Sequence, residues 1–298
     1  MTKTGFIAIV GRPNVGKSTL LNHILGEKIA IVSKRPQTTR NRITGIHTVE
    51  DKQYVFLDTP GLHKPRTKLG DYMVKAADNA IGEADAAILV VEPRETVGDI
   101  EATIIERLKA EKMGAILVVN KTDTVTPANV AKTIAAYAEA YDFDAVIPMV
   151  AKSGKNIDVV LKECERYLTE SPWFFPDDIV TDQPERQIAA EIIREKLLRL
   201  LSEEIPHGTA VVIEAFEESR KLIKIRAEIF CERESHKRII LGKRGSMLKT
   251  VGSYAREDLE KFFGIQVYLD LWVKVKENWR DSVFQLSNFG YNKKDIDT

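Results

Sequence analysis

The stretch that decides the fold reads Gly11-Arg12-Pro13-Asn14-Val15-Gly16-Lys17-Ser18, and it follows a short apolar run, Phe6–Val10. It matches the P-loop pattern G-x-x-x-x-G-K-[ST], which stands between a strand and a helix. The glycines let backbone N–H groups turn toward phosphate oxygens, at a helix N-terminus that already favours negative charge. We therefore expect Lys17 to contact the β- and γ-phosphates and Ser18 to ligate Mg²⁺, with Thr19 in the same binding stretch.

A second motif, Asp58-Thr59-Pro60-Gly61, follows the strand-like run Tyr54–Leu57. An acidic residue at this position can hold the magnesium shell, and a glycine N–H can meet the γ-phosphate. The candidate catalytic residues are Lys17, Gly61 and a threonine of the polar run that precedes this motif, for which Thr39 is favoured.

The polar run from Lys34 to Arg42 contains Thr38 and Thr39. A surface loop is its plain interpretation. In a P-loop GTPase, however, a switch loop here supplies a threonine to Mg²⁺ only when the γ-phosphate is present. The pattern favours Thr39 over Thr38 and leaves the choice between them open.

A third motif, Asn120-Lys121-Thr122-Asp123, ends the run Ala115–Val119 and predicts specificity for guanine. The Asp123 carboxylate can accept hydrogen bonds from guanine N1–H and the 2-amino group, whereas adenine has no donor at either place. A site built to pair a polar group rejects an analogue that lacks it by about 10⁴ to 10⁵. The Lys121 stem can cover the base.

A fourth element, Val150-Ala151-Lys152-Ser153-Gly154, stands where GTPases commonly read S-A-x-x-G. The N–H of Ala151 is expected to meet guanine O6, with Lys152 beside it. Val150 replaces the usual serine, so the side chain that supports this loop differs.

Residues 5 to 150 alternate between apolar runs and longer segments with helical spacing. The runs are Phe6–Val10, Tyr54–Leu57, Ala86–Val91, Ala115–Val119 and Ala145–Val150, and the helical segments between them are Lys17–Leu25, Asp71–Ile81, Asp99–Glu111 and Ala128–Tyr141. A last predicted helix, Ile157–Thr169, follows and closes this unit. Buried strands that alternate with helices predict an α/β domain whose mostly parallel sheet carries helices on both faces.

Two prolines and three aromatic residues between 171 and 178 interrupt this alternation. They predict a linker, 171–184, held against a domain surface, between a first domain at 1–170 and a second at 185–298. The second domain has the order helix, strand, strand, helix, helix, strand, with a short tail helix. Its predicted elements are Glu185–Glu204, Thr209–Phe216, Lys221–Cys231, Glu234–Leu241, Ser246–Phe263, Gln266–Val275 and a helix near Trp279–Leu286. This order predicts an α+β domain of ordinary size.

Composition limits which partners, metal sites and cellular location can be expected. In 298 residues, 44 Lys and Arg balance 44 Asp and Glu, so any nucleic-acid site must be a local patch. The two cysteines, Cys164 and Cys231, belong to no metal-type spacing and are predicted to be small buried hydrophobes. No segment approaches the roughly 18 apolar residues of a membrane span, and a cytoplasmic protein is expected.

A local basic patch surrounds Gly242-Lys243-Arg244-Gly245, which joins two predicted helices. Between 233 and 249, one acid, Glu234, stands against six basic residues: Arg233, Lys237, Arg238, Lys243, Arg244 and Lys249. Glycines permit close approach of a sugar-phosphate backbone, and KH loops of this form clamp about four nucleotides. A lone G-x-x-G is also an ordinary helix-joining turn, but in this element order and charge cluster it predicts RNA binding.

With Gly11–Ser18, Gln37-Thr38-Thr39-Arg40, Asp58–Gly61, Asn120–Asp123 and the C-terminal Gly242–Gly245, the chain resembles the Era family of bacterial GTPases over nearly its whole length. The resemblance implies a P-loop GTPase domain followed by a type II KH domain. It implies GTP and GDP as ligands, binding to the 3′ end of small-subunit ribosomal RNA and help in maturing the small ribosomal subunit. It also implies peripheral association with the inner membrane, and a monomer is expected.

The residue after Gly61 affects the expected rate of GTP hydrolysis. Small signalling GTPases carry a glutamine there to orient the attacking water, and this chain has Leu62. Hydrolysis is therefore expected to be slow or to take its catalytic group from elsewhere. In related GTPases an asparagine at the position of Asn14 helps to coordinate K⁺ near the phosphates, and a role only in shaping the loop is the equal alternative.

Two rival functions remain at this point. The first is a protein-interaction switch whose C-terminal domain is a docking module, and the second is a metabolic enzyme that uses GTP as phosphoryl donor. The C-terminal half has no motif of a substrate pocket, which argues against the second. RNA binding by the C-terminal domain would argue against the first.

Overall fold

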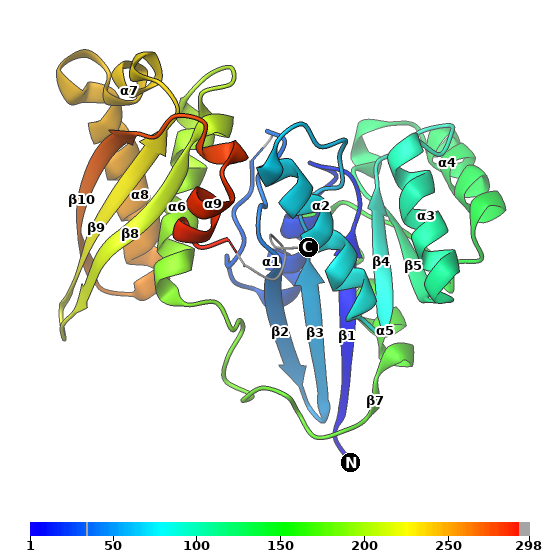
Figure 1. Ribbon diagram of the computed structural model, residues 1–298. Helices are drawn as coiled ribbons and strands as arrows, with labels where there is room; N and C mark the ends of the chain where they lie inside the picture. The colour runs from blue at the N-terminus through cyan, green and yellow to red at the C-terminus, as the bar shows by residue number, and fades with distance from the viewer. Residues whose placement is uncertain (34, 292–298) are drawn as a thin grey trace. The chain divides into compact units, whose positions relative to one another are not determined.

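The computed structural model describes residues 1–33 and 35–291 (Figure 1). They form two compact units. The first unit comprises Met1–Ala30, Thr39–Pro65 and Met73–Asp182. The second comprises Ile31–Thr38, Arg66–Tyr72 and the chain from Gln183 onward, so two short segments of the N-terminal half belong to it.

The first unit is built on one sheet with the strand order β2-β3-β1-β4-β5-β6 and with β7 beside β1. Its strands are β1 (Lys3–Val10), β2 (Ile43–Val49), β3 (Lys52–Asp58), β4 (Ala86–Val91), β5 (Gly114–Val119), β6 (Ala145–Pro148) and β7 (Thr169–Glu170). β1 pairs in parallel with β3 and β4, and β4, β5 and β6 continue in parallel. Among the strands of this sheet that the structure describes, only β2 and β7 run antiparallel to their neighbours, so the predicted mostly parallel sheet is confirmed.

Helices cover both faces of this sheet because successive strand residues point to opposite sides. Ile7 and Ile9 of β1 belong to a core cluster with residues of α1 (Lys17–Leu25) and α5 (Ile157–Cys164). Ala8 and Val10 belong to another, with residues of α2 (Lys68–Gly82), α3 (Asp99–Glu111) and α4 (Pro127–Ala140). Figure 1 shows α2 and α3 in front of the sheet and α1 and α5 behind it.

Two elements of this unit differ from the prediction. Strand β2 had no predicted counterpart, because Ile43–Val49 mixes Thr, Gly and His into its apolar positions. Gly45 lies within it since a Cβ there would come 2.5 Å from Leu21 Cδ1 of α1. The helix predicted over Ile157–Thr169 ends at Cys164, and the chain then makes a 3₁₀ turn, Glu165–Tyr167, before β7.

Residues 171–182 pack on the first unit through a buried amide. Gln53 of β3 donates to the carbonyl of Phe175 at 2.9 Å and accepts from the N–H groups of Phe174 and Phe175. The Phe174 ring stands edge-on to Phe6, with centroids 5.1 Å apart. These contacts fix the path of the segment, as expected for a proline-rich stretch with three aromatic side chains.

The second unit has a three-stranded sheet in the order β10-β9-β8, packed on helices. Its elements are α6 (Glu185–Leu200), β8 (Ala210–Glu218), β9 (Leu222–Cys231), α7 (Glu234–Leu241), α8 (Ser246–Phe263), β10 (Gln266–Val275) and α9 (Val283–Asn288). β9 pairs in parallel with β10 and antiparallel with β8. Ile225 and Ile229 of β9 share a core with Ile192 of α6 and Val251 of α8. The predicted element order is thus confirmed.

The structure also bears on membrane spanning. Among residues 1–33 and 35–291, no helix has both the length and the apolar character needed to cross a bilayer.

Trp279 is the largest fully buried side chain among the described residues, and it ties the end of the second unit to its core. Its indole N–H donates to the carbonyl of Gly208 at 3.0 Å, and its ring contacts Phe289 and Tyr291. We expect Trp279→Ala to lower the free energy of unfolding of the second unit by about 3–5 kcal/mol, because it leaves a large cavity and an unpaired carbonyl. Trp272 is 57 % exposed on β10. Trp272→Ala should therefore change this free energy by no more than about 0.5 kcal/mol. Hydrogen exchange of the amides of α6 and α8 measures both effects, and equal protection in the two variants would contradict the prediction.

Candidate functional site

The motif residues of the first unit lie at one edge of its sheet. Because β1, β3, β4, β5 and β6 are parallel, their carboxyl ends lie at the same edge. The P-loop follows β1, Thr59–Gly61 follow β3 and Asn120–Asp123 follow β5. Open α/β sheets bind their ligands at this edge.

The P-loop backbone needs its glycines. Gly11 and Gly16 have φ angles of 146° and 109°, and a Cβ would lie 2.3 Å from the Val90 carbonyl oxygen in one case and 2.2 Å from Asn120 Nδ2 in the other. Helix α1 begins at Lys17 with no side-chain cap and no acidic residue in its first turn. Its first N–H groups therefore have no side-chain anion to compete with a phosphate.

Lys17 is buried beneath the loop that precedes it. Its ammonium group donates to the carbonyls of Gly11 at 3.1 Å and Arg12 at 2.9 Å. Burial lowers the pKa of Lys17 to about 8, and the nearby Asp58 carboxylate partly offsets this effect. The two carbonyls thus hold the ammonium group in place, and phosphate oxygens can replace them as its hydrogen-bond acceptors.

Three oxygen-bearing side chains meet beside Lys17. The Ser18 hydroxyl donates to Asp58 Oδ2 at 2.6 Å, and the Ser18 and Thr39 hydroxyl oxygens lie 2.9 Å apart. The neighbouring threonine is used differently, because the Thr38 hydroxyl donates to the Arg35 carbonyl at 2.7 Å. Geometry therefore brings Thr39, and not Thr38, to Ser18.

These residues fit a magnesium ion. Asp58 is fully buried, and its Oδ1 has no hydrogen-bond partner among the described residues. Burial raises the pKa of Asp58 to about 6, and Lys17 and the Ser18 hydroxyl oppose the rise. A buried carboxylate with an unmatched oxygen, next to two hydroxyl groups, offers the oxygen ligands that Mg²⁺ prefers.

The segment after Asp58 is held against the P-loop. The Thr59 hydroxyl donates to the Ile9 carbonyl at 2.8 Å, and Pro60 follows it. A Cβ on Gly61 would lie 2.5 Å from Pro13 Cα, so only glycine fits this approach. Leu62 is buried in the core that contains Ala77 and Ile81. A leucine held there cannot orient a water molecule.

The Asn120 side chain joins three loops. Its amide donates to the Val15 carbonyl at 2.7 Å and accepts from the Ala151 N–H at 2.8 Å. The residue is 3 % exposed. Two well-made bonds in a buried place hold the P-loop, the end of β5 and the loop after β6 in one arrangement.

The residues predicted to read guanine flank this amide. Lys121 Nζ donates to the Asn14 carbonyl at 2.8 Å. Asp123 and Lys152 are exposed, Ala151 is buried, and Ala151 begins a 3₁₀ turn that ends at Ser153. An exposed carboxylate is accessible to a base, whereas the Ala151 N–H is already engaged by Asn120.

Two acidic residues of this edge were not found from the sequence. Glu101 of α3 is buried and forms an ion pair with Arg12 of the P-loop, and Glu92 pairs with Lys121. Glu101 resembles an ordinary acidic residue in the first turn of a helix, and 89 residues separate it from Arg12. No local pattern signals such a contact.

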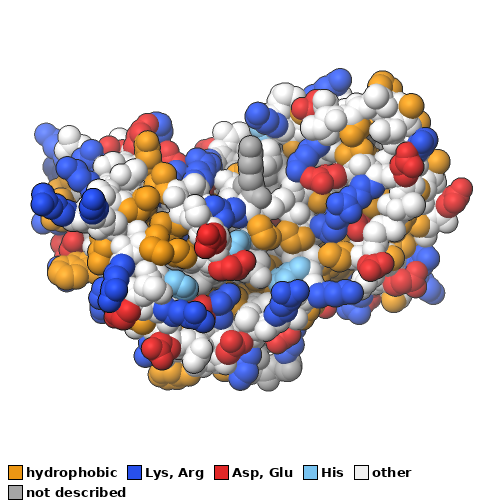
Figure 2. Space-filling model, turned by 90° about the horizontal axis from the view of Figure 1, so that it is seen from above, with side chains coloured by type: hydrophobic (Ala, Val, Ile, Leu, Met, Phe, Trp, Pro, Cys, Tyr) orange, Lys and Arg blue, Asp and Glu red, His pale blue; other side chains and the backbone are white. Residues whose placement is uncertain are grey.

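The second unit carries the basic junction between α7 and α8. Gly242 has φ 72° and a Cβ there would lie 2.7 Å from the Met247 nitrogen, so the turn requires glycine. Arg233, Arg238, Lys243, Arg244 and Lys249 are exposed or partly exposed, and Lys237 is half-buried. Figure 2 looks down on α7 and shows Lys and Arg side chains gathered on the left, where this helix lies. The structure therefore brings the predicted RNA-binding residues to one accessible junction.

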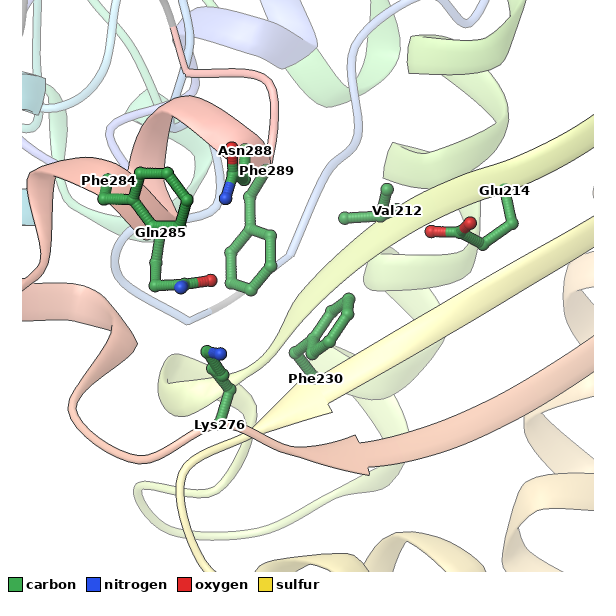
Figure 3. A pocket seen from close by; sticks show the side chains of 8 residues that line it. All are labelled: Val212, Glu214, Phe230, Lys276, Phe284, Gln285, Asn288 and Phe289. Carbon is green, nitrogen blue, oxygen red and sulfur yellow. The ribbon is translucent and has the colours of Figure 1, made fainter.

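A separate pocket of about 290 Å³ lies in the second unit between α9 and the sheet (Figure 3). Phe230 of β9 stacks on Phe289, the residue after α9, with ring centroids 4.5 Å apart, and Lys276 and Gln285 reach toward them from the rim. None of the motif residues of either unit lines this pocket.

Comparison with known families agrees with this geometry. Residues 6–121 match the family described as "50S ribosome-binding GTPase", and residues 204–280 match the family described as "KH domain". The first match covers the P-loop, Asp58–Gly61 and the start of the guanine motif. The second covers β8, β9, the basic junction and β10.

Curated relatives match over nearly the full length. GTPase Era of Clostridium acetobutylicum is 51% identical over 98% of this chain and 98% of its own. GTPase Era of Clostridioides difficile is 50% identical over 99% of this chain and all of its own. The chain belongs to the GTPase Era family. It is accordingly a GTPase, with a P-loop domain followed by a KH domain.

Solved structures of Era show the same fold. A variant of Aquifex aeolicus Era bound to GDP·AlF₄⁻ has a TM-score of 0.93 and 38% identity, covering 97% of this chain and 99% of the other. Era in complex with MgGDPNP and nucleotides 1506–1542 of 16S ribosomal RNA has a TM-score of 0.93 and 39% identity, covering 98% and 99%.

The bridging role of Asn120 generates a test. Asn120→Ala leaves the Val15 carbonyl and the Ala151 N–H without their buried partner, at a cost of about 1–3 kcal/mol each. We expect the affinity for GDP to fall by about one to two orders of magnitude in equilibrium binding. The matched control is Gln53→Ala, which removes an equally buried amide that binds the 171–182 segment. It should lower stability and leave the GDP affinity within about twofold; unchanged affinity in Asn120→Ala would show that the amide does not organise the site.

Proposed function

We propose that this Era-family GTPase is a magnesium-dependent switch that binds the 3′-end region of small-subunit ribosomal RNA and assists small-subunit assembly and maturation. The observation that carries the proposal is the basic, glycine-bounded junction Gly242–Gly245 in a chain that also has a complete nucleotide-binding edge. The Era structure with MgGDPNP and nucleotides 1506–1542 of 16S ribosomal RNA supports it, since that chain aligns with 98% of this one.

GTP and GDP are the proposed ligands of the first unit. Backbone N–H groups of the P-loop stretch Gly11–Thr19, in which Pro13 has none to offer, and the Lys17 ammonium group bind the phosphates, and Gly61 offers its N–H to the γ-phosphate. Ser18, Thr39 and Asp58 hold Mg²⁺, which when bound neutralises charge on the phosphate oxygens. Asp123 pairs with the guanine edge, the Lys121 stem covers the base, and Ala151 and Lys152 line the same place.

Hydrolysis in this site lacks a side chain that orients the water. Leu62 fills the position of the usual glutamine and is buried in the core, so slow intrinsic turnover is proposed. A potassium ion near Asn14 would supply positive charge where it develops on the phosphates. Asn14 is a partly exposed P-loop residue in the left-handed region, with φ 64°, and its carbonyl binds Lys121.

The potassium proposal predicts a specific salt effect. GTP turnover should rise severalfold when K⁺ replaces Na⁺ at constant ionic strength. Asn14→Gly should erase the difference, because glycine adopts the positive φ without strain and removes only the side chain. Steady-state phosphate release measures both rates. Equal turnover of the parent in the two salts would remove potassium from the mechanism.

The RNA-binding surface consists of the junction and the basic residues around it. Positive φ at Gly242 and Gly245 and at Arg244 turns the backbone sharply, so that Lys243 and Arg244 are accessible at its tip. The backbone of single-stranded RNA carries one charge per nucleotide, and phosphate contacts dominate the affinity of such sites. This local excess of positive charge attracts the RNA backbone although the whole chain has no net charge.

Replacing Lys243 and Arg244 with aspartate tests this surface. Arg244 has φ 53°, which aspartate tolerates, so the turn should survive. RNA affinity should fall by orders of magnitude, and the slope of its salt dependence should decrease by about 0.7 for each phosphate that the variant no longer neutralises. GTP affinity should stay unchanged. Titration of a fluorescent single-stranded RNA at several salt concentrations measures the effect.

The matched control carries the same change of charge elsewhere in the second unit. Arg220 and Lys221 are exposed in the turn between β8 and β9. The double aspartate variant there should bind RNA nearly as well as the parent. If both double variants bind alike, the junction is not the RNA site, and a docking role for the second unit takes its place.

The remaining parts of the proposal concern location and assembly. We propose further that the protein is a cytoplasmic monomer, and the family resemblance supports peripheral binding to the inner face of the cell membrane. Sedimentation and flotation with anionic lipid vesicles test the two points separately.

A further inference from the structure

The pocket of the second unit lies on the face of the sheet opposite to the one on which α6 and α8 pack. Successive residues of a strand point to opposite faces. Val211 and Ile229 belong to the core that the sheet shares with α6 and α8, whereas the next residues, Val212 and Phe230, line the pocket. Helix α9 lies over this second face, and the pocket of about 290 Å³ is enclosed between the two (Figure 3).

Aromatic rings give the pocket flat apolar walls. Phe230 and Phe289 are stacked, with ring centroids 4.5 Å apart and 28° between the ring planes. Phe284 of α9 also lines the pocket and is 69 % exposed. A pocket of this volume is at the lower end of the range for ligand sites, about 300–1,000 Å³, so it has room for one ring system. Every nucleobase has a π-face that stacks on such rings.

Polar side chains complete the lining. Lys276 follows β10 and is exposed, and Glu214 comes from β8. Gln285 and Asn288 are three residues apart on α9 and therefore lie on the same side of this helix. Amides and a carboxylate offer donors and acceptors to the edge of a base, and an ammonium group attracts its phosphate. An aliphatic side chain of a protein would leave these groups without partners, which disfavours a protein segment as the occupant.

The pocket adjoins the proposed RNA-binding surface along the chain. Arg233, the first of the six basic residues of that surface, stands three residues after Phe230 and immediately before α7. The Lys276 N–H donates to the Cys231 carbonyl at 2.8 Å, so the carboxyl ends of β9 and β10 lie together. A single strand that leaves the basic surface at the start of α7 therefore reaches the pocket by passing round this end of the sheet.

We propose that the pocket binds one unstacked base of the single-stranded RNA whose backbone is held by Gly242–Gly245 and the basic residues around it. The base stacks on the aromatic rings, its edge pairs with the amides of Gln285 and Asn288, and its phosphate lies near Lys276. The inference rests on the proposed RNA-binding function and deepens it, because it adds a contact to a base to the contacts with phosphates.

Methyl NMR of the full chain tests the pocket directly. Val212 lines the pocket and Val211 faces the core, so adjacent residues supply a reporter and an internal control. With the nucleotide site of the first unit filled by GDP, adenosine 5′-monophosphate should shift the methyl signals of Val212 and leave those of Val211 in place. Ribose 5′-phosphate, which lacks the base, should shift neither. An equal response to the two compounds would show a site for phosphate alone and overturn the proposal, as would a Val212 signal that adenosine 5′-monophosphate does not move.

RNA affinity tests whether the pocket is used. Phe284→Ala removes an exposed ring and should leave the fold intact. It should weaken binding of a single strand of about twelve nucleotides roughly tenfold, because stacked bases contribute strongly to such affinities. A strand of about four nucleotides, the length that a KH loop clamps, should bind within about twofold of the parent.

Two further variants sharpen this comparison. Lys276→Ala should also weaken binding of the longer strand and should reduce the slope of its salt dependence by about 0.7, the value for one phosphate. Tyr268→Ala is the matched control, because this ring is 61 % exposed on the same face of the sheet but does not line the pocket. It should leave both affinities unchanged.

The outcomes separate the pocket from the junction. If Phe284→Ala and Tyr268→Ala bind the longer strand alike, or if Phe284→Ala weakens both strands equally, the base-binding pocket is overturned and the junction stands. The proposed function fails by a different result, namely full RNA affinity in the chain that carries Lys243→Asp and Arg244→Asp, and the pocket proposal then fails with it.

Discussion

One buried amide holds the nucleotide-binding edge together. Asn120 donates to the Val15 carbonyl and accepts from the Ala151 N–H, and so joins loops that follow three different strands. Parallel pairing brings these loops to the same edge of the sheet but does not fix their mutual spacing. The amide does, because both of its bonds are made where water cannot replace them. The P-loop and the two loops predicted to read the base are thereby related through one side chain.

Buried charge explains much of the rest. Lys17 and Asp58 are both buried in the first unit. Burial lowers the pKa of Lys17 and raises the pKa of Asp58, and in both cases it favours the neutral form. The charge of each residue partly offsets the effect of burial on the other, and a bound nucleotide with its metal would offset it further. Such a site is stabilised by its ligand. In the second unit, Arg194 keeps its charge because the Glu191 carboxylate pairs with it, and its guanidinium donates to the carbonyls of Gln37 and Thr38.

The sequence predicted what local patterns determine. The alternation of strands and helices predicted the mostly parallel sheet. The predicted first and last residues also agree with the structure for α1, α3, α7, α8 and β10. The same alternation missed β2, an edge strand whose Thr, Gly and His residues interrupt the apolar run, and it extended the helix that ends at Cys164 too far. The pairs Arg12–Glu101 and Lys121–Glu92 could not be predicted, since each joins residues far apart in the chain. The same holds for the contact between Arg194 and Thr38.

That last contact shows why a motif is only part of a site. Pattern alone left Thr38 and Thr39 as alternatives, because both are threonines in the same polar run. The structure distinguishes them by what surrounds the backbone: the Thr38 hydroxyl turns back to Arg35, its carbonyl meets Arg194, and the next side chain faces Ser18. The surroundings of the backbone, which no motif encodes, therefore distinguish two threonines that the pattern leaves as equal candidates.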